Sequence, residues 1–400
     1  MQRLGVALIV GAVAALTACG DDAIPEGSTA SLSLSAGPVL VIGRMDGSDE
    51  YLFQTIVGTT TLPGGEIAVA DDGFKNVRVY DTSGEMLAGM GSAGAGPGQF
   101  LSIRGIWTTP EGTIGVFDPV QLRVTTFFAD GTLATSPRLL PPPPDELPPR
   151  ATLQTFLGSF SDGSIGVGWM AFGDQPSVGS IVPDRYVLGR FSAKGPFLGM
   201  LGEETYFDRT MFSSNMGGPV AFSRIPHAVV FADSLYFTDG VTPAIEVRDR
   251  DGVAGRSIPL PVEPPDVDQA LAALAPLLSS EGPFNTPEQL EASPRPESIP
   301  VVSGLLVDEL GFVWVRRYAV PDDALWVAKG VDRFGGEWLV FDPRGAPGPT
   351  LRLPGGFRPL VIEPDRILGI QVDEFDVQRL AVYGLNRGGE ALETDEGGAR

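Results

Sequence analysis

Apolar and polar residues alternate along most of the chain, in short runs separated by turns that contain glycine. Between residues 63 and 131 one such unit occurs twice, first as 65–69 followed by 80–84, then as 112–116 followed by 127–131. In both copies the first and last glycines are 19 residues apart. Alternation with a period of two predicts β-strands, and strands joined in this way form a meander of the size of one propeller blade.

The unit recurs to the C-terminus, giving six copies, with insertions in the third and fifth. Its first strand recurs at residues 163–167, 233–237, 311–315 and 365–370, and its second strand at 191–195, 248–252, 341–345 and 382–388. An apolar run before each copy supplies an innermost strand. The pattern therefore predicts an all-β fold, a six-bladed β-propeller over residues 37–386. The run 38–43 matches an outer strand, and we expect it to complete the last blade and remove a free sheet edge.

Residues 264–296, between the fourth and fifth copies, have a helical pattern. Asp266 can cap a helix that Pro276 must bend or end. One face of this helix is apolar and consists of Val267, Leu271, Leu274 and Leu278. The sequence at 286–289 matches a capping box with proline at the first helical position. We expect a small helical pair that either covers apolar surface or closes over the channel, and the apolar face favours the cover.

The chain has 400 residues and a formal net charge of −22, with a sequence pI near 4.4. Such a surface repels phosphate backbones and excludes nucleic acid as a partner. The chain has one cysteine, Cys19, and one histidine, His227. It therefore has no intrachain disulfide, no zinc site with two histidines and no histidine dyad. A Ser-His-Asp triad would have to use His227, which on an inner strand is more typical of a structural histidine.

The N-terminus has the pattern of an export signal. Arg3 precedes an apolar run at 4–15, which is shorter than the roughly 20 residues that a membrane-spanning helix needs. Residues 16–19, Leu-Thr-Ala-Cys, resemble the bacterial lipobox, which implies cleavage before Cys19 and lipid attachment to its sulfur. The alternative is an ordinary signal peptide. We expect a lipoprotein signal peptide at 1–18 and a protein anchored to a bacterial membrane, on the periplasmic side or the cell surface.

Two further segments flank the predicted propeller. Residues 19–36 are small and polar and predict a flexible tether. Residues 387–400 are rich in glycine and acidic side chains and predict a disordered tail.

A resemblance to known proteins rests on the segment from 69 to 106. It contains Val-Ala-Asp at 69–71, Asn-Val-Arg-Val-Tyr-Asp at 76–81 and Gly-Ala-Gly-Pro-Gly-Gln-Phe at 94–100. These motifs resemble NHL-type repeats, and the whole mature chain resembles the bacterial six-bladed β-propeller lipoproteins. The resemblance implies an exported propeller without a defined activity, and it carries over no catalytic motif.

Four aspartates end the second strand of their blades: Asp71, Asp118, Asp239 and Asp373. Aspartate is a good turn former, because its carboxylate accepts hydrogen bonds from backbone amides a few residues on. Four carboxylates at equivalent positions could also hold a cation. The repeat places them at strand ends in either case, which favours the role in turns.

Five arginines are candidate ligand-binding residues. Arg104, Arg224 and Arg358 fall at the start of inner strands, while Arg316 and Arg317 follow the second strand of the fifth copy. In a propeller these positions share one face, so we expect the side chains to converge at one mouth of the channel. Guanidinium groups bind carboxylates and phosphates, which suggests a pocket for an anionic small molecule or a peptide carboxylate. The alternative is ion pairing between blades.

These observations favour a non-enzymatic scaffold on a membrane that binds a ligand or an envelope protein. They assign no catalytic residue, metal or cofactor. The alternative is a calcium-dependent, lactonase-like hydrolase of the gluconolactonase type, with a site built from Glu, Asn and Asp. None of the few asparagines falls on a clear inner strand: Asn76, Asn215, Asn285 and Asn386.

Overall fold

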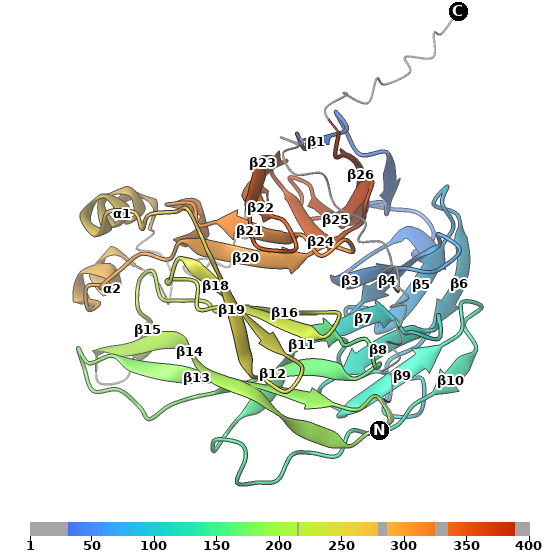
Figure 1. The fold of residues 1–400 in the computed structure, drawn as a ribbon, viewed down its shortest axis with the longest axis horizontal. Coiled ribbons are helices and arrows are strands. Elements are labelled where there is room, and N and C mark those ends of the chain that lie inside the picture. The colour runs from blue at the N-terminus through green and yellow to red at the C-terminus, as the bar shows by residue number, and fades with distance from the viewer. Residues whose placement is uncertain (1–30, 214–215, 279–285, 325–334, 389–400) are drawn as a thin grey trace, which may run out of the picture.

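The computed structural model of the protein describes residues 31–213, 216–278, 286–324 and 335–388. Within these residues the strands form six antiparallel sheets that follow one another around a ring (Figure 1). We number the sheets as blades in chain order and give their strands from the centre outward. Blade one consists of β3 (Ile56–Thr61), β4 (Ile67–Asp71), β5 (Asn76–Tyr80) and β6 (Met86–Met90). Blade two consists of β7 (Gly105–Thr108), β8 (Ile114–Asp118), β9 (Arg123–Phe127) and β10 (Leu133–Thr135).

The other four blades repeat this meander. Blade three consists of β11 (Thr152–Ser159), β12 (Ile165–Ala171), β13 (Val182–Phe191), β14 (Phe197–Ser213) and β15 (Met216–Pro219). Blade four consists of β16 (His227–Phe231), β17 (Ser234–Thr238), β18 (Ala244–Asp249) and β19 (Ala254–Pro259). Blade five consists of β20 (Val302–Val307), β21 (Val313–Arg317), β22 (Gly336–Phe341) and β23 (Pro347–Leu353). Blade six consists of β24 (Phe357–Ile362), β25 (Arg366–Val372), β26 (Gln378–Asn386), and β1 (Ser33–Leu34) with β2 (Leu40–Ile42).

The first strands of the blades contact one another in succession, in the order β3, β7, β11, β16, β20 and β24. The ring is closed because β24 contacts β3 in turn. The strands next to them are buried on both faces, as β4 and β8 show, because neighbouring blades pack face to face. A closed ring of meander sheets is a β-propeller, so the predicted all-β fold is confirmed.

Both ends of the described chain meet on β26. Leu40 pairs with Val382 and Ile42 with Leu380, so the N-terminal strand completes the last blade as predicted. A second short strand, β1, pairs with the far end of β26, and in Figure 1 both lie beside the last blade. The predicted tether at 19–36 is therefore too long, because Ser33 and Leu34 already belong to the sheet. Residues 1–30 and 389–400, which include Cys19 and nearly all of the predicted tail, lie outside the described residues.

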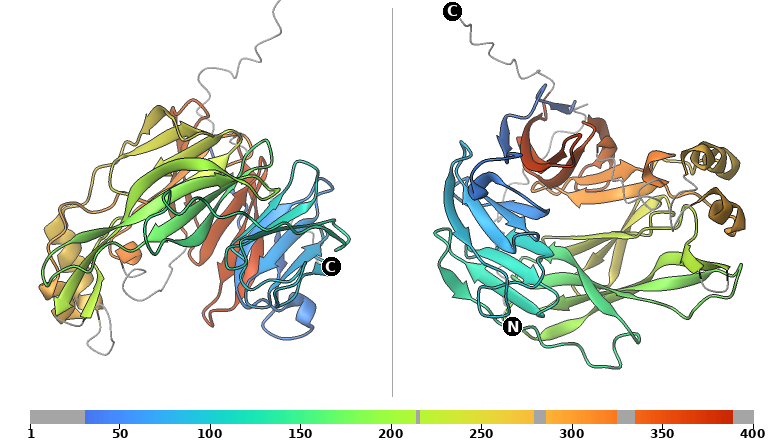
Figure 2. Two further views of the ribbon diagram at one scale, coloured as in Figure 1. Left: turned by 90° about the horizontal axis from the view of Figure 1, so that it is seen from below. Right: turned by 180° about the vertical axis from the view of Figure 1, so that it is seen from behind.

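Blade three departs from the pattern of the other blades. Its fourth strand, β14, has 17 residues, and the far end of this strand pairs with β15. The segment thus extends the blade into a long hairpin that continues past β12. Figure 1 and Figure 2 show this hairpin beside the helices.

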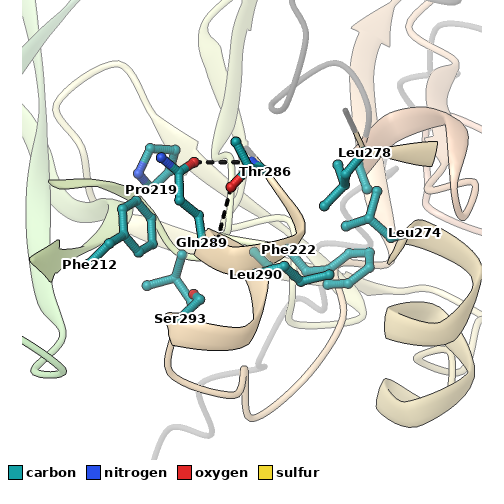
Figure 3. Close-up of a pocket in the computed structure, with 12 residues that line it drawn as sticks. Phe212, Pro219, Phe222, Leu274, Leu278, Thr286, Gln289, Leu290 and Ser293 are labelled. Atoms are coloured by element: carbon teal, nitrogen blue, oxygen red, sulfur yellow. Dashed lines mark hydrogen bonds between the residues drawn. The ribbon is translucent and has the colours of Figure 1, made fainter. Parts of the chain in front are cut away.

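The helical pair lies where the sequence places it. Helix α1 (Val267–Leu274) is capped by Asp266, and a 3-10 turn containing Pro276 follows it. Helix α2 (Pro287–Ala292) begins with the complete capping box of Thr286 and Gln289, drawn as dashed lines in Figure 3. Figure 3 also shows Phe222, Leu274 and Leu290 gathered between the helices, and the cavity left there is only about 30 Å³. The helices therefore cover apolar side chains.

In the described part of the chain, no helix is both long and apolar enough to cross a membrane.

Candidate functional site

The four strand-end aspartates are turn residues. Asp71 and Asp118 are fully buried, and each accepts at least three hydrogen bonds from backbone amides. Asp239 accepts from the amides of the two residues that follow Gly240, and Asp373 accepts from the amides of Phe375 and Val377. Their carboxylate oxygens are thus directed at the chain around them, which confirms the interpretation of these residues as turn formers.

At least four of the five candidate arginines form ion pairs, and that of Arg316 with Asp323 is described below. Arg104 Nη1 lies 2.8 Å from Asp72 Oδ2, which links blades one and two. Arg224 Nε lies 3.2 Å from Asp208 Oδ2, which links blades three and four. Arg317 pairs at 2.9 Å with Glu337 inside blade five. For these residues the structure agrees with the alternative of ion pairing, and neither Arg104 nor Arg224 lines the pockets described below.

Arg316 and Arg358 lie together in a cavity of about 280 Å³ where the inner strands of blades four, five and six begin. An adjoining cavity of about 170 Å³ shares His227, Ser303 and Arg316 with it. We call the two cavities together the central pocket. Its polar lining consists of His227, Ser303, Arg316, Tyr318, Asp323, Trp338 and Arg358.

The guanidinium group of Arg316 is held from several sides. Its Nε donates to the carbonyl of Gly335 at 2.8 Å, and its Nη1 donates to Asp323 Oδ1 at 2.7 Å and to Ser303 Oγ at 3.1 Å. The other oxygen of Asp323 accepts from the backbone amide of Ala319 at 2.7 Å. The group is therefore oriented before any ligand arrives, which reduces the entropy lost on binding.

A glycine on the facing strand makes room for this arrangement. Gly304 of β20 lies opposite Arg316 in the sheet register. A Cβ atom at this position would be 3.1 Å from Arg316 Cβ and 3.3 Å from the ring of Trp338, both tighter than ordinary contacts. The pocket thus depends on the missing side chain at residue 304.

Several polar atoms of the central pocket are buried without a hydrogen-bond partner among the described residues. They are His227 Nε2, Tyr318 Oη and Trp338 Nε1. Burial, with a smaller contribution from the charge of Arg316, lowers the pKa of His227 to about 4, so its ring is neutral at physiological pH. Burial likewise raises the pKa of the Tyr318 hydroxyl, which remains protonated. A buried polar group without a partner costs about 1–3 kcal/mol, so their concentration on one pocket marks it as a candidate binding site.

The helical insertion supports one wall of this pocket. Tyr318 packs against the apolar cluster that contains Ala270 and Leu274 of α1 together with Phe222 and Ile299. The insertion therefore fixes the position of a pocket residue as well as covering apolar surface.

A second, more open cleft of about 860 Å³ lies beside the pocket, between blades five and six. Its charged lining is mixed: Arg316, Arg317 and Arg352 face Asp322, Glu337, Asp373 and Asp376. The two signs nearly balance, so the cleft has no clear charge preference.

Side chains that could bind a metal ion are dispersed over the described residues. Nowhere among them do three or more His, Cys, Asp or Glu side chains form a group that could hold a metal ion. Asn76 begins β5 and Asn386 ends β26, so neither lies on an inner strand, while Asn215 and Asn285 fall outside the described residues.

Sequence reasoning identified Arg316 and Arg358 but missed most of the groups around them. His227 was interpreted as structural, and Tyr318, Asp323 and Trp338 were not singled out as site residues. One signal was available, because His227, Ser303 and Arg358 all lie within the first two residues of successive inner strands. Asp323 carried no such signal, since it belongs to an insertion that the repeat does not include.

Comparison with solved structures places the fold among β-propellers. A member of the DUF4221 family from Bacteroides vulgatus matches with a TM-score of 0.51 at 8% identity, over 90% of this chain and 100% of that one. A gluconolactonase from Xanthomonas campestris matches with a TM-score of 0.42 at 13% identity, over 89% and 98% of the two chains. An aldose sugar dehydrogenase from Streptomyces coelicolor matches with a TM-score of 0.44 at 12% identity, over 89% and 99%.

The fold is that of a propeller. At such low identities the likeness concerns the fold alone and brings no chemistry to the central pocket. No family model and no curated protein matches the sequence.

His227 gives a prediction for pH dependence. Its pKa lies near 4 in the folded protein against an ordinary value of 6.5, so between these pH values the unfolded chain binds more protons. This residue's contribution to stability should be complete above pH 6.5 and should be lost as the pH falls toward 4, by on the order of 3 kcal/mol. NMR of the imidazole, unambiguous because the chain has one histidine, should show no titration above about pH 5.

The control for this prediction is His227→Gln, which keeps a polar side chain that does not titrate. Thermal unfolding of the wild type and of this variant is measured between pH 4 and 7. Both proteins have the same carboxylates, so the difference between their pH dependences is due to the histidine. An imidazole that titrates near 6.5 in the folded protein would contradict the buried, neutral state.

Proposed function

We propose that the protein is a lipid-anchored, extracytoplasmic β-propeller that binds a small ligand in the central pocket without transforming it. The observation that carries this proposal is the set of buried, unpartnered atoms on His227, Tyr318 and Trp338 around the preoriented guanidinium of Arg316. These groups can form directed hydrogen bonds with a ligand, which would compensate for their burial.

The same geometry favours binding over acid–base catalysis. A general base works best when its pKa lies near the operating pH, and that of His227 lies near 4. Its Nε2 also has no hydroxyl within hydrogen-bond distance among the described residues, whereas an activated serine requires such a contact. The site is thus better suited to holding a molecule than to attacking it.

Localisation is proposed from the N-terminal sequence. A lipobox-like Leu-Thr-Ala-Cys ending at the chain's only cysteine supports lipid attachment at Cys19, and two or three acyl chains would give durable anchoring. In this proposal the protein contacts the membrane through the lipid attached to Cys19, and the propeller lies outside the cytoplasm. An envelope protein bound to the propeller surface remains a second partner within this proposal.

The anchor is tested by Cys19→Ala. We expect the wild-type protein to sediment with membranes and to incorporate labelled palmitate, because the sulfur is the site of lipid attachment. The variant should appear in the soluble extracytoplasmic fraction without label. Cys19→Ser serves as a second variant, since serine keeps the polarity but not the thiol. Membrane association that survives both substitutions would contradict the lipid anchor.

The ligand site is tested by filling it. A ligand that binds only the folded state stabilises the protein and so raises its melting temperature. At a free ligand concentration of one hundred times the Kd, the free energy of unfolding rises by about 2.7 kcal/mol. A low-molecular-mass extract of the host cells should therefore raise the melting temperature of the wild type by several degrees, but not that of Gly304→Val. The matched control is Gly355→Val, because a Cβ there meets no atom within 4 Å. Equal shifts in all three proteins would place binding outside the pocket.

A further inference from the structure

The charged side chains of the central pocket are already engaged within the protein. Arg316 donates to Asp323 Oδ1 at 2.7 Å, and the other oxygen of Asp323 accepts from the amide of Ala319. Arg358 likewise has an interaction of its own. An ion in this pocket would give up its hydration for a site whose charges already have partners, and the desolvation of an unpaired ion is costly. The pocket therefore favours a neutral molecule over the anion that the arginines alone suggest.

The unpartnered atoms of the pocket require both kinds of hydrogen bond. The indole N–H of Trp338 can only donate, so it needs an acceptor. The hydroxyl of Tyr318 can donate and accept, and Nε2 of the neutral His227 ring does one or the other according to its tautomer. A ligand hydroxyl also donates and accepts, through one oxygen, so it matches all three groups with either tautomer of His227.

His227 lies where the two cavities of the pocket meet. It lines the smaller cavity together with Tyr318 and the larger one together with Trp338, so a molecule in either cavity meets two of the three groups. The apolar part of the lining consists of Leu305, Leu306 and Pro359 in the larger cavity and of Ile225, Pro300 and Val302 in the smaller one. These walls suit a compact apolar body, and volumes of about 280 and 170 Å³ exclude a large one.

We infer that the ligand of the central pocket is a small neutral alcohol, hydrogen-bonded through its hydroxyl groups to His227, Tyr318 and Trp338, with a compact apolar body between the apolar walls. This inference rests on the proposed function and specifies its ligand. A carboxylate or an ether only accepts and an ammonium group only donates, so none of them serves both tautomers of His227. A carboxamide does both, but through separate atoms that must each face the right group.

The stability of the ligand-free protein gives the first test. Tyr318→Phe removes only a buried hydroxyl without a partner, so it should raise the melting temperature by about 1–4 °C. The matched control is Tyr80→Phe, because the hydroxyl of the fully buried Tyr80 donates to the carbonyl of Glu50 at 2.6 Å. This control should lower the melting temperature. The same substitution thus has opposite effects at the two sites, which a purely structural role of Tyr318 would not produce.

Five probes with one ring and different polar groups test the ligand class: cyclohexanol, methoxycyclohexane, cyclohexanecarboxamide, cyclohexanecarboxylate and cyclohexylammonium. Binding to the purified protein is followed by calorimetry and by the resonance of the single histidine, which lies in the pocket. We expect cyclohexanol to bind about fivefold more tightly than each of the others, the usual effect of one hydrogen bond. His227→Phe should weaken its binding by a similar factor, whereas Tyr80→Phe should leave it unchanged within about twofold.

The outcomes separate the inference from the proposed function. An ether, an amide or an ion that binds as tightly as cyclohexanol, with the histidine resonance perturbed, would overturn the alcohol and leave the pocket as a binding site. A melting temperature that falls in Tyr318→Phe as it does in Tyr80→Phe would show that the hydroxyl already has a partner, and would also overturn the inference. If none of the five compounds perturbs the resonance at millimolar concentrations, both the inference and the pocket as the binding site fail. The probes are compared in the wild type, so this test holds even if His227→Phe fails to fold.

Discussion

A chain that begins at Arg44 should not form a stable propeller, whereas one that begins at residue 31 should fold. Both N-terminal strands pair with β26, so the shorter chain leaves this nine-residue strand as an open edge. It also removes Ile42, which is 1% exposed and packs in a cluster with Ile56 and Ile67. An unpaired edge exposes backbone groups to other chains, so we expect aggregation and the loss of a cooperative unfolding transition.

Two point variants on the same strand separate packing from pairing. Ile42→Ala keeps the backbone pairing and should cost about 2–5 kcal/mol, the usual range for removing a buried side chain of this size. Its neighbour Val41 is 46% exposed, and Val41→Ala should change stability by less than about 1 kcal/mol. Urea unfolding of both variants measures the difference. A chain beginning at Arg44 that unfolds cooperatively at the wild-type midpoint would show that the ring closes without these strands.

Asp308→Ala should destabilise the protein by about 3–5 kcal/mol. The carboxylate of Asp308 is fully buried and accepts from the amides of Leu310 and Phe312 and from Trp314 Nε1. It also pairs at 2.6 Å with Arg387, whose guanidinium lies over the rings of Phe312 and Trp314. Alanine would leave a guanidinium and an indole N–H without their acceptor, which costs more than the contact alone.

The matched control is Asp342→Ala, in the equivalent turn between β22 and β23 of the same blade. Asp342 accepts from the amides of Arg344 and Ala346 but has no ion pair among the described residues. Its loss should cost about 1 kcal/mol, the typical contribution of such hydrogen bonds. Chemical denaturation measures both values. Equal costs for the two aspartates would mean that Arg387 adds nothing to the folded state.

The fold could be predicted from the sequence because its signals are local. Each blade repeats a glycine at a turn and a strand in which apolar and polar residues alternate. The starts of the two helices are indicated by Asp266 and Thr286, which cap them in the structure. Strand β1 was missed because it has two residues, one of them polar, and gains its stability from β26 at the other end of the chain. No local pattern can encode such a contact.

The pocket could be predicted only in part, for a similar reason. The repeat places Arg316 and Arg358 on the same face, but it also places Arg104 and Arg224 there, and these form ion pairs with Asp72 and Asp208 outside the central pocket. Which arginine lines the pocket and which one links two blades depends on the side chains around each of them. The neutral state of His227 likewise results from burial by several blades, which the sequence around it does not report.

The closure of the ring has a consequence for the order in which the protein can be made. Ser33 is among the first residues to be synthesised, yet its partner is Asn386, near the end of the chain. Blades one to five can form as their meanders emerge, but the last sheet must wait until β26 has been synthesised. Contacts over such a separation form slowly. During that time the first strands need protection from other chains, which makes a chaperone important for yield.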